Sequence, residues 1–565
     1  MAKKCCVLIL AATIVALILR LPRLGQRPMH GDEAVHAIKF ATLLEEGAYT
    51  YDPNEYHGPT LNYLTLIPAR LASAGKLTEV TEFILRIVPV FFGVLLVLLL
   101  LLTADGLGPR AAVCAAVLTA ISPAMVFYSR YYIHETLLVC FTFGAITSAY
   151  RYTQNKNLLW AISTGIFVGL MHATKETCII AFGSMFLALL LVLLMRRPKG
   201  CLVSAARAIK RSHFIAGLTA AVIVSALFYS SFFTNPGGIL DSFRAYGAYF
   251  DRAGSNTLHI HPWYYYLKIL LYSRYSDGPI WTEALIMLLA AVGFVAAMTR
   301  KGLQDIRHKT QDTRNKTQDT GLESGVWSLV SGVNVHLLRF IAFYTLVLTV
   351  VYSAIPYKTP WCMLGFLHGM ILLAGVGAVV LVRSAPNVLP RLIVIFLLFG
   401  ASVHLAWQGY LSSYKFCADS RNPYVYAHPT TEVFTIAQRV EDIARVHEDG
   451  KQMQIQVICP EGDYWPLPWY LRSFSKVQWQ NKVADDAPSA PLIIASDKIQ
   501  EALTNKLYAL TPLEERQMYL FLFDEPYYVW LRPKVKLLGL VRKDLWDLYQ
   551  QQQTQSVESQ TAGEK

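Results

Sequence analysis

The sequence predicts an all-α polytopic membrane protein that carries a small C-terminal α/β domain. Of its 565 residues, 54% are hydrophobic and only 16% are charged, and the mean hydropathy is +0.35. Average soluble domains contain about 25% charged residues. Long apolar runs recur along the first 410 residues, whereas the chain from about residue 411 has the mixed composition of a soluble domain. These three observations exclude an ordinary soluble protein.

Eleven apolar runs are long enough to cross a membrane, since a hydrocarbon core of about 30 Å takes roughly 20 helical residues. The runs begin near Cys5, Phe83, Ala111, Ile133, Leu158, Thr177, Phe214, Ile280, His336, Trp361 and Leu392. The stretch at 158–195 is divided at His172–Thr177 because a Lys-Glu pair is costly inside a bilayer. The first run follows Lys3 and Lys4 as in a signal peptide, but without a small-residue cleavage site we expect it to remain as a span.

Basic residues in the loops predict the orientation, because Lys and Arg near span ends are retained in the cytoplasm. One set of loops, including residues 196–211 and 300–316, is rich in them, whereas the short loops of the other face hold only Arg130, Lys175 and Lys358. We therefore expect a multi-pass protein of the plasma (inner) membrane with its N-terminus in the cytoplasm. The net charge of +12 lies mostly on this cytoplasmic rim, which favours contact with membrane lipids over nucleic acid.

The domain boundaries follow from the changes in composition. Residues 1–410 form the predicted transmembrane domain, in which residues 22–82 are the first outer loop and residues 300–335 a flexible cytoplasmic loop. Residues 411–548 form the extracytoplasmic domain, and residues 549–565, rich in polar residues, are expected to be disordered. A helix with one apolar face is predicted at 34–44, suited to the membrane interface.

Alternating helical and strand patterns predict an α/β layer structure for the C-terminal domain. Helices are expected at Glu432–His447 and Lys498–Leu507, and strands at Met453–Ile458, Leu492–Ala495 and Tyr519–Phe523. The aromatic run Tyr464–Leu471 either stacks on sugar rings or packs the domain against the helices. Cys417 and Cys459 are the two cysteines of this domain, and whether they form a disulfide stays open.

Ionisable residues gather in the outer loops. Asp32 and Glu33 lie just past the first span, where a carboxylate can deprotonate a sugar hydroxyl, hold a metal or cap a helix. Three short loops of the same face contribute Arg130 with Glu135, Lys175 with Glu176, and Lys358. Cations at headgroup depth suit a lipid-linked phosphate, and a carboxylate suits an incoming nucleophile. These basic residues can also have purely structural roles. Arg130 can pair with Glu135 and Lys175 with Glu176, and Lys358 can anchor the chain at the membrane interface.

On these residues the chain resembles the GT-C superfamily of membrane glycosyltransferases that use polyprenyl-phosphate sugars, in particular the protein O-mannosyltransferase and aminoarabinose transferase branch. The motifs are Gly31-Asp32-Glu33, Tyr56-His57-Gly58-Pro59, Ser122-Pro123, Ser129-Arg130, Glu135 and Thr174-Lys175. With Tyr357–Trp361 and Tyr464–Tyr470, the chain looks closest to the prokaryotic flippase-activity-associated family of archaeal N-glycosylation. His57-Gly58-Pro59 departs from the His-Pro-Pro of many relatives, which puts the role of that turn in doubt.

The resemblance implies a GT-C-like helical bundle of about 11 transmembrane helices. It also implies that a sugar passes from a polyprenyl-phosphate donor to an acceptor hydroxyl on a glycan, lipid or protein, with inversion. Asp32 would be the general base and Glu33 its catalytic partner. Lys175, Arg130 and Lys358 would bind the donor phosphate.

The remaining candidate residues concern the acceptor and a metal. Glu33, His57 and Glu135 would position the acceptor, and Trp263 and Tyr264 would contact it or belong to an aromatic belt at the membrane interface. In the alternative reading, Asp32, Glu33 and Glu135 bind Mg or Mn, which prefer oxygen ligands; the pattern itself requires no cofactor.

A second class of function is a glycolipid flippase or transporter, or an accessory subunit without chemistry. Transporters place substrate groups near the bilayer midplane between repeated halves. Here the ionisable residues lie on one rim and the spans show no internal repeat, which favours an enzyme. An enzyme further requires Asp32, Lys175, Arg130 and Lys358 to line one outward-facing cavity.

Overall fold

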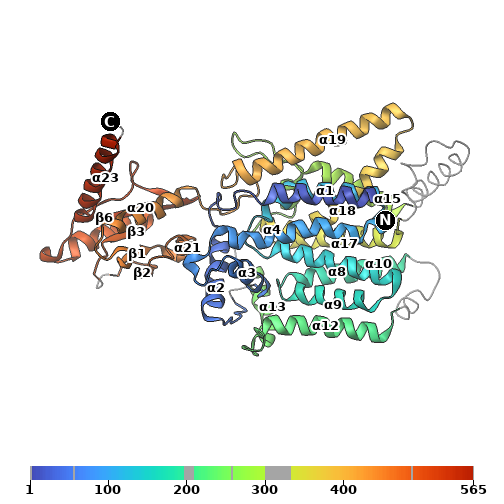
Figure 1. Ribbon diagram of the computed structural model, residues 1–565, viewed down its shortest axis with the longest axis horizontal. Coiled ribbons are helices and arrows are strands. Elements are labelled where there is room, and N and C mark those ends of the chain that lie inside the picture. Colours follow the sequence, from blue (N-terminus) through green and yellow to red (C-terminus); the bar gives the residue numbers. More distant parts are fainter. Residues whose placement is uncertain are drawn as a thin grey trace, which may run out of the picture.

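The computed structural model describes residues 3–54, 57–195, 209–255, 259–299, 333–484 and 488–563. Long helices run side by side in one bundle, and a smaller domain with a β-sheet stands at one end of it (Figure 1). We call that end of the bundle the domain end. The predicted flexible loop at 300–335 lies almost wholly outside the described residues.

Each of the eleven predicted spans falls on one helix of the bundle. They are α1 (Lys3–Arg20), α4 (Glu82–Leu98), α6 (Pro109–Ile121), α8 (Glu135–Asn155), α9 (Leu158–His172), α10 (Cys178–Leu194), α12 (Arg211–Tyr229), α15 (Ala284–Met298), α17 (Val335–Ala354), α18 (Leu364–Ser384) and α19 (Val388–Tyr410). Within the described ranges, five helical stretches are long and apolar enough to cross a membrane, and four further apolar helices are shorter. The protein is thus mostly helical with several membrane-spanning candidates, while the count of 11 stays a prediction.

Small residues allow the bundle helices to approach closely. A side chain at Gly293 of α15 would overlap the carbonyl of Leu373 in α18, and one at Gly377 of α18 would overlap the carbonyl of Leu289 in α15. Inside a bilayer the hydrophobic effect does not drive helices together, so close backbone contacts of this kind stabilise their association. The predicted division at His172–Thr177 is confirmed, because α9 ends at His172 and α10 begins at Cys178.

Shorter elements fold over the domain end of the bundle. They are α2 (Gly31–Glu46), α3 (Thr60–Leu71), α7 (Pro123–Tyr128), α13 (Gly238–Ser255) and α14 (Tyr265–Leu271). A further short helix, α5 (Ala104–Leu107), follows α4. The predicted helix at 34–44 is part of α2, so the first outer loop contains regular structure directly after the acid pair.

The C-terminal domain is built on one mixed sheet. Its strands are β1 (Ile455–Ile458), β2 (Val477–Gln480), β3 (Leu492–Ser496), β4 (Tyr519–Phe521), β5 (Val529–Arg532) and β6 (Val535–Arg542), in the order β2-β1-β3-β6-β4 with β5 also paired to β6. β1 pairs in parallel with β2 and β3, and β6 pairs antiparallel with β3, β4 and β5. The helices are α20 (Glu432–Val446), α21 (Leu467–Tyr470), α22 (Gln500–Asn505) and α23 (Lys543–Gly563).

The predicted elements of this domain are confirmed at α20, α22, β1, β3 and β4. Apolar residues of α20, such as Val433 and Val440, share a core with Val457 of β1. One expectation differs from the structure, and one open question is answered by it. The tail is helical, since α23 continues to Gly563. Cys417 and Cys459 are both buried free thiols, so they form no disulfide.

The aromatic run after β1 packs the domain onto the bundle. The Trp469 indole donates a hydrogen bond to Glu82 Oε1 at 2.9 Å, and the Met29 amide donates to the Tyr470 hydroxyl at 2.8 Å. Arg472 donates to the carbonyls of Leu77 and Val80. The packing alternative for this run is therefore confirmed, and it fixes the domain directly beside the acid pair.

Candidate active site

Asp32 is the second residue of α2 and its side chain is 51% exposed. The N-cap of this helix is His30, whose Nδ1 accepts a hydrogen bond from the Asp32 amide at 3.0 Å. Of the three uses considered for Asp32, capping the helix is therefore contradicted, because His30 is the N-cap. His30 Nδ1 lies 3.8 Å from Asp32 Oδ1, and within the described residues no group donates a hydrogen bond to the carboxylate. Asp32 is thus open to a ligand.

The charges around Asp32 keep its carboxylate ionised. Burial by itself favours the protonated acid, but three nearby histidines, His30, His36 and His57, together with Lys175 lower the pKa of Asp32 below its ordinary value of 3.8. The N-terminus of α2 carries a partial positive charge that acts in the same direction. An exposed, ionised carboxylate that makes no hydrogen bond of its own can accept a proton from a substrate hydroxyl.

Glu33 faces the opposite way and is structural. Both of its oxygens accept hydrogen bonds from Arg27 and Arg86 at 2.8–3.1 Å, and the amides of His30 and Tyr132 also donate to it. Its side chain has no exposed surface. Although burial opposes ionisation, the two guanidinium charges lower the pKa of Glu33 to about 2. These contacts engage both oxygens, so they do not support the predicted catalytic, acceptor-positioning and metal-binding roles of Glu33.

Arg130 is also directed away from the site. Its guanidinium donates to the carbonyls of Arg20, Pro22 and Arg23 at 2.6–3.2 Å, and it lies over the ring of Tyr414 at 4.5 Å. These contacts hold the chain that follows α1. They do not support the prediction that Arg130 binds the donor phosphate.

Lys175 lies in the turn between α9 and α10, within electrostatic reach of Asp32. Its ammonium group forms an ion pair with Glu135, the first residue of α8. Both side chains are more than 90% buried, and Lys175 is close enough to lower the pKa of Asp32. The sequence-based alternative, a pair between Lys175 and Glu176, differs from this arrangement, since Glu176 bonds to other groups.

His57 and Glu176 form a hydrogen-bonded pair near Asp32. His57 Nδ1 lies 2.7 Å from Glu176 Oε2, and the Tyr51 hydroxyl donates to Glu176 Oε1 at 3.0 Å. The rings of His36 and His134 lie 6.1 and 5.4 Å from that of His57. The sequence pointed to His57, but it gave no signal for the other rings, which are brought in from α2 and from the loop before α8.

Lys358 contacts the loop that contains His259 and His261. Its Nζ donates to the carbonyls of His261, at 3.1 Å, and Ile355, and burial lowers the pKa of its ammonium group. Its backbone amide donates to the His259 carbonyl at 2.9 Å. Burial lowers the pKa of His259, whereas the Asp32 charge opposes that shift, so this loop lies within electrostatic reach of Asp32.

Trp263 and Tyr264 are not part of the cluster. Trp263 is 65% and Tyr264 is 47% exposed, and their rings contact each other at 5.7 Å. The histidines just before them contact Tyr426 instead, with His259 Nδ1 2.6 Å and His261 Nε2 3.2 Å from its hydroxyl. In this aromatic run the residues nearest the site are therefore the histidines.

In the described part of the chain, the side chains give little support for a divalent-cation site. No group of three or more His, Cys, Asp or Glu side chains there is arranged to hold a metal ion. Of the three predicted ligands, Glu33 is fully engaged by arginines and Glu135 by Lys175. The predicted Mg or Mn site formed by Asp32, Glu33 and Glu135 does not fit these positions.

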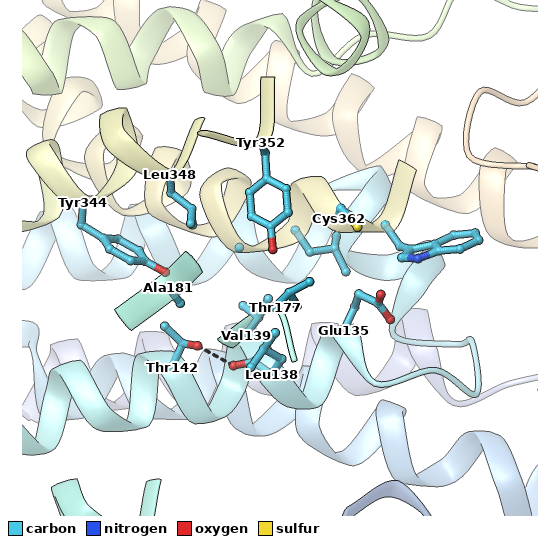
Figure 2. A pocket seen from close by; sticks show the side chains of 13 residues that line it. Glu135, Leu138, Val139, Thr142, Thr177, Ala181, Tyr344, Leu348, Tyr352 and Cys362 are labelled. Carbon is cyan, nitrogen blue, oxygen red and sulfur yellow. Dashed lines mark hydrogen bonds between the residues drawn. The ribbon is translucent and has the colours of Figure 1, made fainter. Parts of the chain in front are cut away.

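An apolar pocket begins at Glu135. It is a partly open depression between α8, α10, α17 and α18, and its space of about 400 Å³ includes open solvent. In Figure 2, Tyr344 and Tyr352 reach across it toward Val139 and Thr142, and Glu135 lies at one end. Trp361 also lines it and contacts the His30 ring at 5.7 Å. A neighbouring pocket of about 310 Å³ shares Val139 and Thr142, so the two pockets adjoin each other along α8.

Comparison with known proteins shows which family and which fold this arrangement of a helical bundle and a C-terminal α/β domain resembles. Residues 68–235 match the family model described as dolichyl-phosphate-mannose-protein mannosyltransferase. A search of curated proteins gives no match. The matched family and the similar solved structures are GT-C superfamily enzymes, so the chain has the GT-C fold.

Two solved structures show the extent of the similarity. ArnT from Cupriavidus metallidurans bound to undecaprenyl phosphate has a TM-score of 0.56 at 12% identity, covering 96% of this chain and 98% of that one. The oligosaccharyltransferase AglB from Archaeoglobus fulgidus, in complex with an inhibitory peptide and a dolichol-phosphate, has a TM-score of 0.52 at 12% identity. It covers 89% of this chain and 70% of that one.

Proposed function

We propose that this protein is an integral-membrane glycosyltransferase that moves a hexose or pentose from a polyprenyl-phosphate donor to an acceptor hydroxyl. The observation that carries the proposal is the environment of Asp32. Its carboxylate is exposed and ionised, and Lys175, which lowers its pKa, pairs with Glu135 at the edge of an apolar pocket. A base near an apolar pocket suits a reaction between a lipid-linked sugar and a polar acceptor.

Asp32 is the general base in this mechanism. The acceptor O–H proton passes to the Asp32 carboxylate while the acceptor oxygen forms a bond to the anomeric carbon. The bond between that carbon and the phosphate oxygen breaks, and its electron pair leaves with the polyprenyl phosphate. Attack from the face opposite the phosphate inverts the anomeric centre. Because a phosphate is a good leaving group, no strong acid is needed.

Lys175 and Lys358 are the cations proposed for the donor phosphate. Both are buried at the domain end, and each can add a charge-assisted hydrogen bond to a phosphate oxygen. Lys175 is held by Glu135 at the entrance of the pocket. The isoprenoid tail then lies in the apolar space lined by Leu138 and Leu348. The complexes of ArnT with undecaprenyl phosphate and of AglB with dolichol-phosphate support this type of ligand.

The reaction is proposed for the extracytoplasmic face. The domain end has few basic residues in its short loops, whereas the loops at the opposite end are rich in Lys and Arg, as expected for cytoplasmic loops. The N-terminus is then cytoplasmic and the C-terminal domain extracytoplasmic.

The test uses the purified protein in vesicles with polyprenyl-phosphate hexoses and pentoses, and measures release of polyprenyl phosphate together with the anomeric configuration of the product. We expect release with at least one donor, with inversion. Absence of release from every donor, with folded protein that moves glycolipid between leaflets, would instead support the flippase alternative.

A further inference from the structure

His57 and Glu176 form an imidazole–carboxylate pair of defined geometry. His57 Nδ1 is committed to Glu176 Oε2 at 2.7 Å, and the second oxygen of Glu176 is held by the Tyr51 hydroxyl. The Glu176 side chain is 4% exposed and that of His57 is 28% exposed. Burial opposes ionisation of Glu176, but the charge and the hydrogen bond of His57 lower the pKa of Glu176. An ionised, buried carboxylate therefore lies behind a partly exposed imidazole.

The turn that carries His57 is fixed in place. A side chain at Gly58 would overlap the carbonyl of Ala173, whereas glycine allows the Thr60 amide to donate to that carbonyl at 3.2 Å. The Gly58 carbonyl lies 3.0 Å from His134 Nε2. Glycine in place of the first proline of His-Pro-Pro is thus required here by the close approach to the turn that contains Glu176.

His57 is one of several groups from different elements that lie within electrostatic reach of Asp32. Asp32 and His36 come from α2, His134 from the loop before α8, and Lys175 from the turn beside Glu176. His57 is one of the groups that lower the pKa of Asp32. His36 cannot serve as a base of similar strength, because burial and the neighbouring His57 lower its pKa to about 3.

We propose that the His57–Glu176 pair is a proton relay that regenerates Asp32 after each transfer. In this step the Asp32 O–H bond breaks and a new N–H bond forms at His57 Nε2, directly or through one water. Asp32 returns to the carboxylate, His57 becomes an imidazolium beside the Glu176 anion, and the proton then leaves to solvent from the exposed edge of the ring. No oxidant or further reactant is needed. The proposal rests on the transferase function described above.

The direction of transfer follows from ordinary basicities. An imidazole binds a proton more tightly than a carboxylate by about two pKa units, and a carboxylate behind the ring further stabilises the imidazolium. A proton taken up by Asp32 therefore moves readily to the imidazole.

The experiment compares wild type, His57→Gln, His57→Ala, His57→Lys and Glu176→Gln in the release assay between pH 5 and 9. The expected loss of kcat in His57→Gln is roughly tenfold to a hundredfold, at the low end of general acid–base effects, with the donor KM unchanged. Free imidazole restores turnover to His57→Ala, which a merely structural role of the ring does not explain. Glu176→Gln gives a smaller loss of kcat, and His447→Gln in the C-terminal domain is the control.

Each outcome distinguishes the relay from its alternatives. Full activity of His57→Lys with a raised donor KM in His57→Gln would overturn the relay and make His57 a phosphate-binding cation. A wild-type rate and pH profile in His57→Gln, with Asp32→Asn inactive, would overturn the relay alone. If the wild-type protein itself releases no polyprenyl phosphate, it is the transferase function that fails.

Discussion

Asp32 and Glu33 are adjacent in the chain, yet their carboxylates lie in opposite environments. Glu33 is fully buried and held by Arg27 and Arg86, whereas the side chain of Asp32 is 51% exposed and lies near three histidines and Lys175. This follows from helix geometry, since successive residues point about 100° apart around the axis. One acid therefore fixes α2 against α4, and that anchor presents the other acid to the site.

Glu33→Gln should destabilise the protein more than it impairs the chemistry. The substitution leaves two buried guanidinium groups without their anion, and breaking a buried ion pair in this way costs about 3–5 kcal/mol. Thermal unfolding in detergent should show a large decrease in the midpoint, while the exposed change Glu46→Gln should show none. Unaltered stability with abolished turnover would return Glu33 to a catalytic role.

The stability of the wild-type protein should depend on pH through the same residue. The pKa of Glu33 is lowered from 4.5 to about 2 in the folded protein, so its contribution is complete above pH 4.5 and is lost as the pH falls toward 2. At about 1.4 kcal/mol per pKa unit, the contribution is roughly 3 kcal/mol. Unfolding followed between pH 6 and 3 should show this loss in wild type and a flatter profile in Glu33→Gln. Parallel profiles would contradict the assignment.

Variants of Lys175 and Arg130 should distinguish an effect on donor binding from an effect on stability. The double variant Lys175→Met/Glu135→Gln removes the buried ion pair without leaving one charge alone, so it should fold but bind polyprenyl phosphate at least tenfold more weakly. Arg130→Lys loses hydrogen bonds to carbonyls, so it should lower the unfolding midpoint and leave affinity unchanged. Titration with polyprenyl phosphate measures both, and a reversed pattern would reinstate Arg130 at the phosphate.

The docking of the C-terminal domain can be tested at Tyr470 and Trp469. Tyr470→Phe removes the hydrogen bond from the Met29 amide, a change worth about 1 kcal/mol, and Trp469→Ala also removes a fully buried indole. We expect Trp469→Ala, and to a lesser degree Tyr470→Phe, to accelerate proteolytic cleavage between residues 416 and 431. Phe521→Ala, on an exposed side chain of the sheet, is the control and should cleave at the wild-type rate.

The sequence predicted the helices well because length and apolarity are local properties of the chain. All eleven apolar runs became helices, and the division at His172–Thr177 was placed correctly. The site was predicted less well, because its pairings join distant residues. The sequence did not show that Arg86 and Arg27 would occupy Glu33, that Arg130 would reach backbone carbonyls, or that Tyr51 and His57 would meet Glu176. Such partners are set by tertiary packing, which periodicity does not record.

The most direct test of the account is the rate of polyprenyl phosphate release by Asp32→Asn beside wild type, with donor affinity and the unfolding midpoint measured on the same samples. Asparagine has nearly the same shape but cannot take the acceptor proton. The account predicts that turnover falls by at least a hundredfold while affinity and stability stay at wild-type values. Turnover at the wild-type rate in a folded Asp32→Asn protein would contradict it.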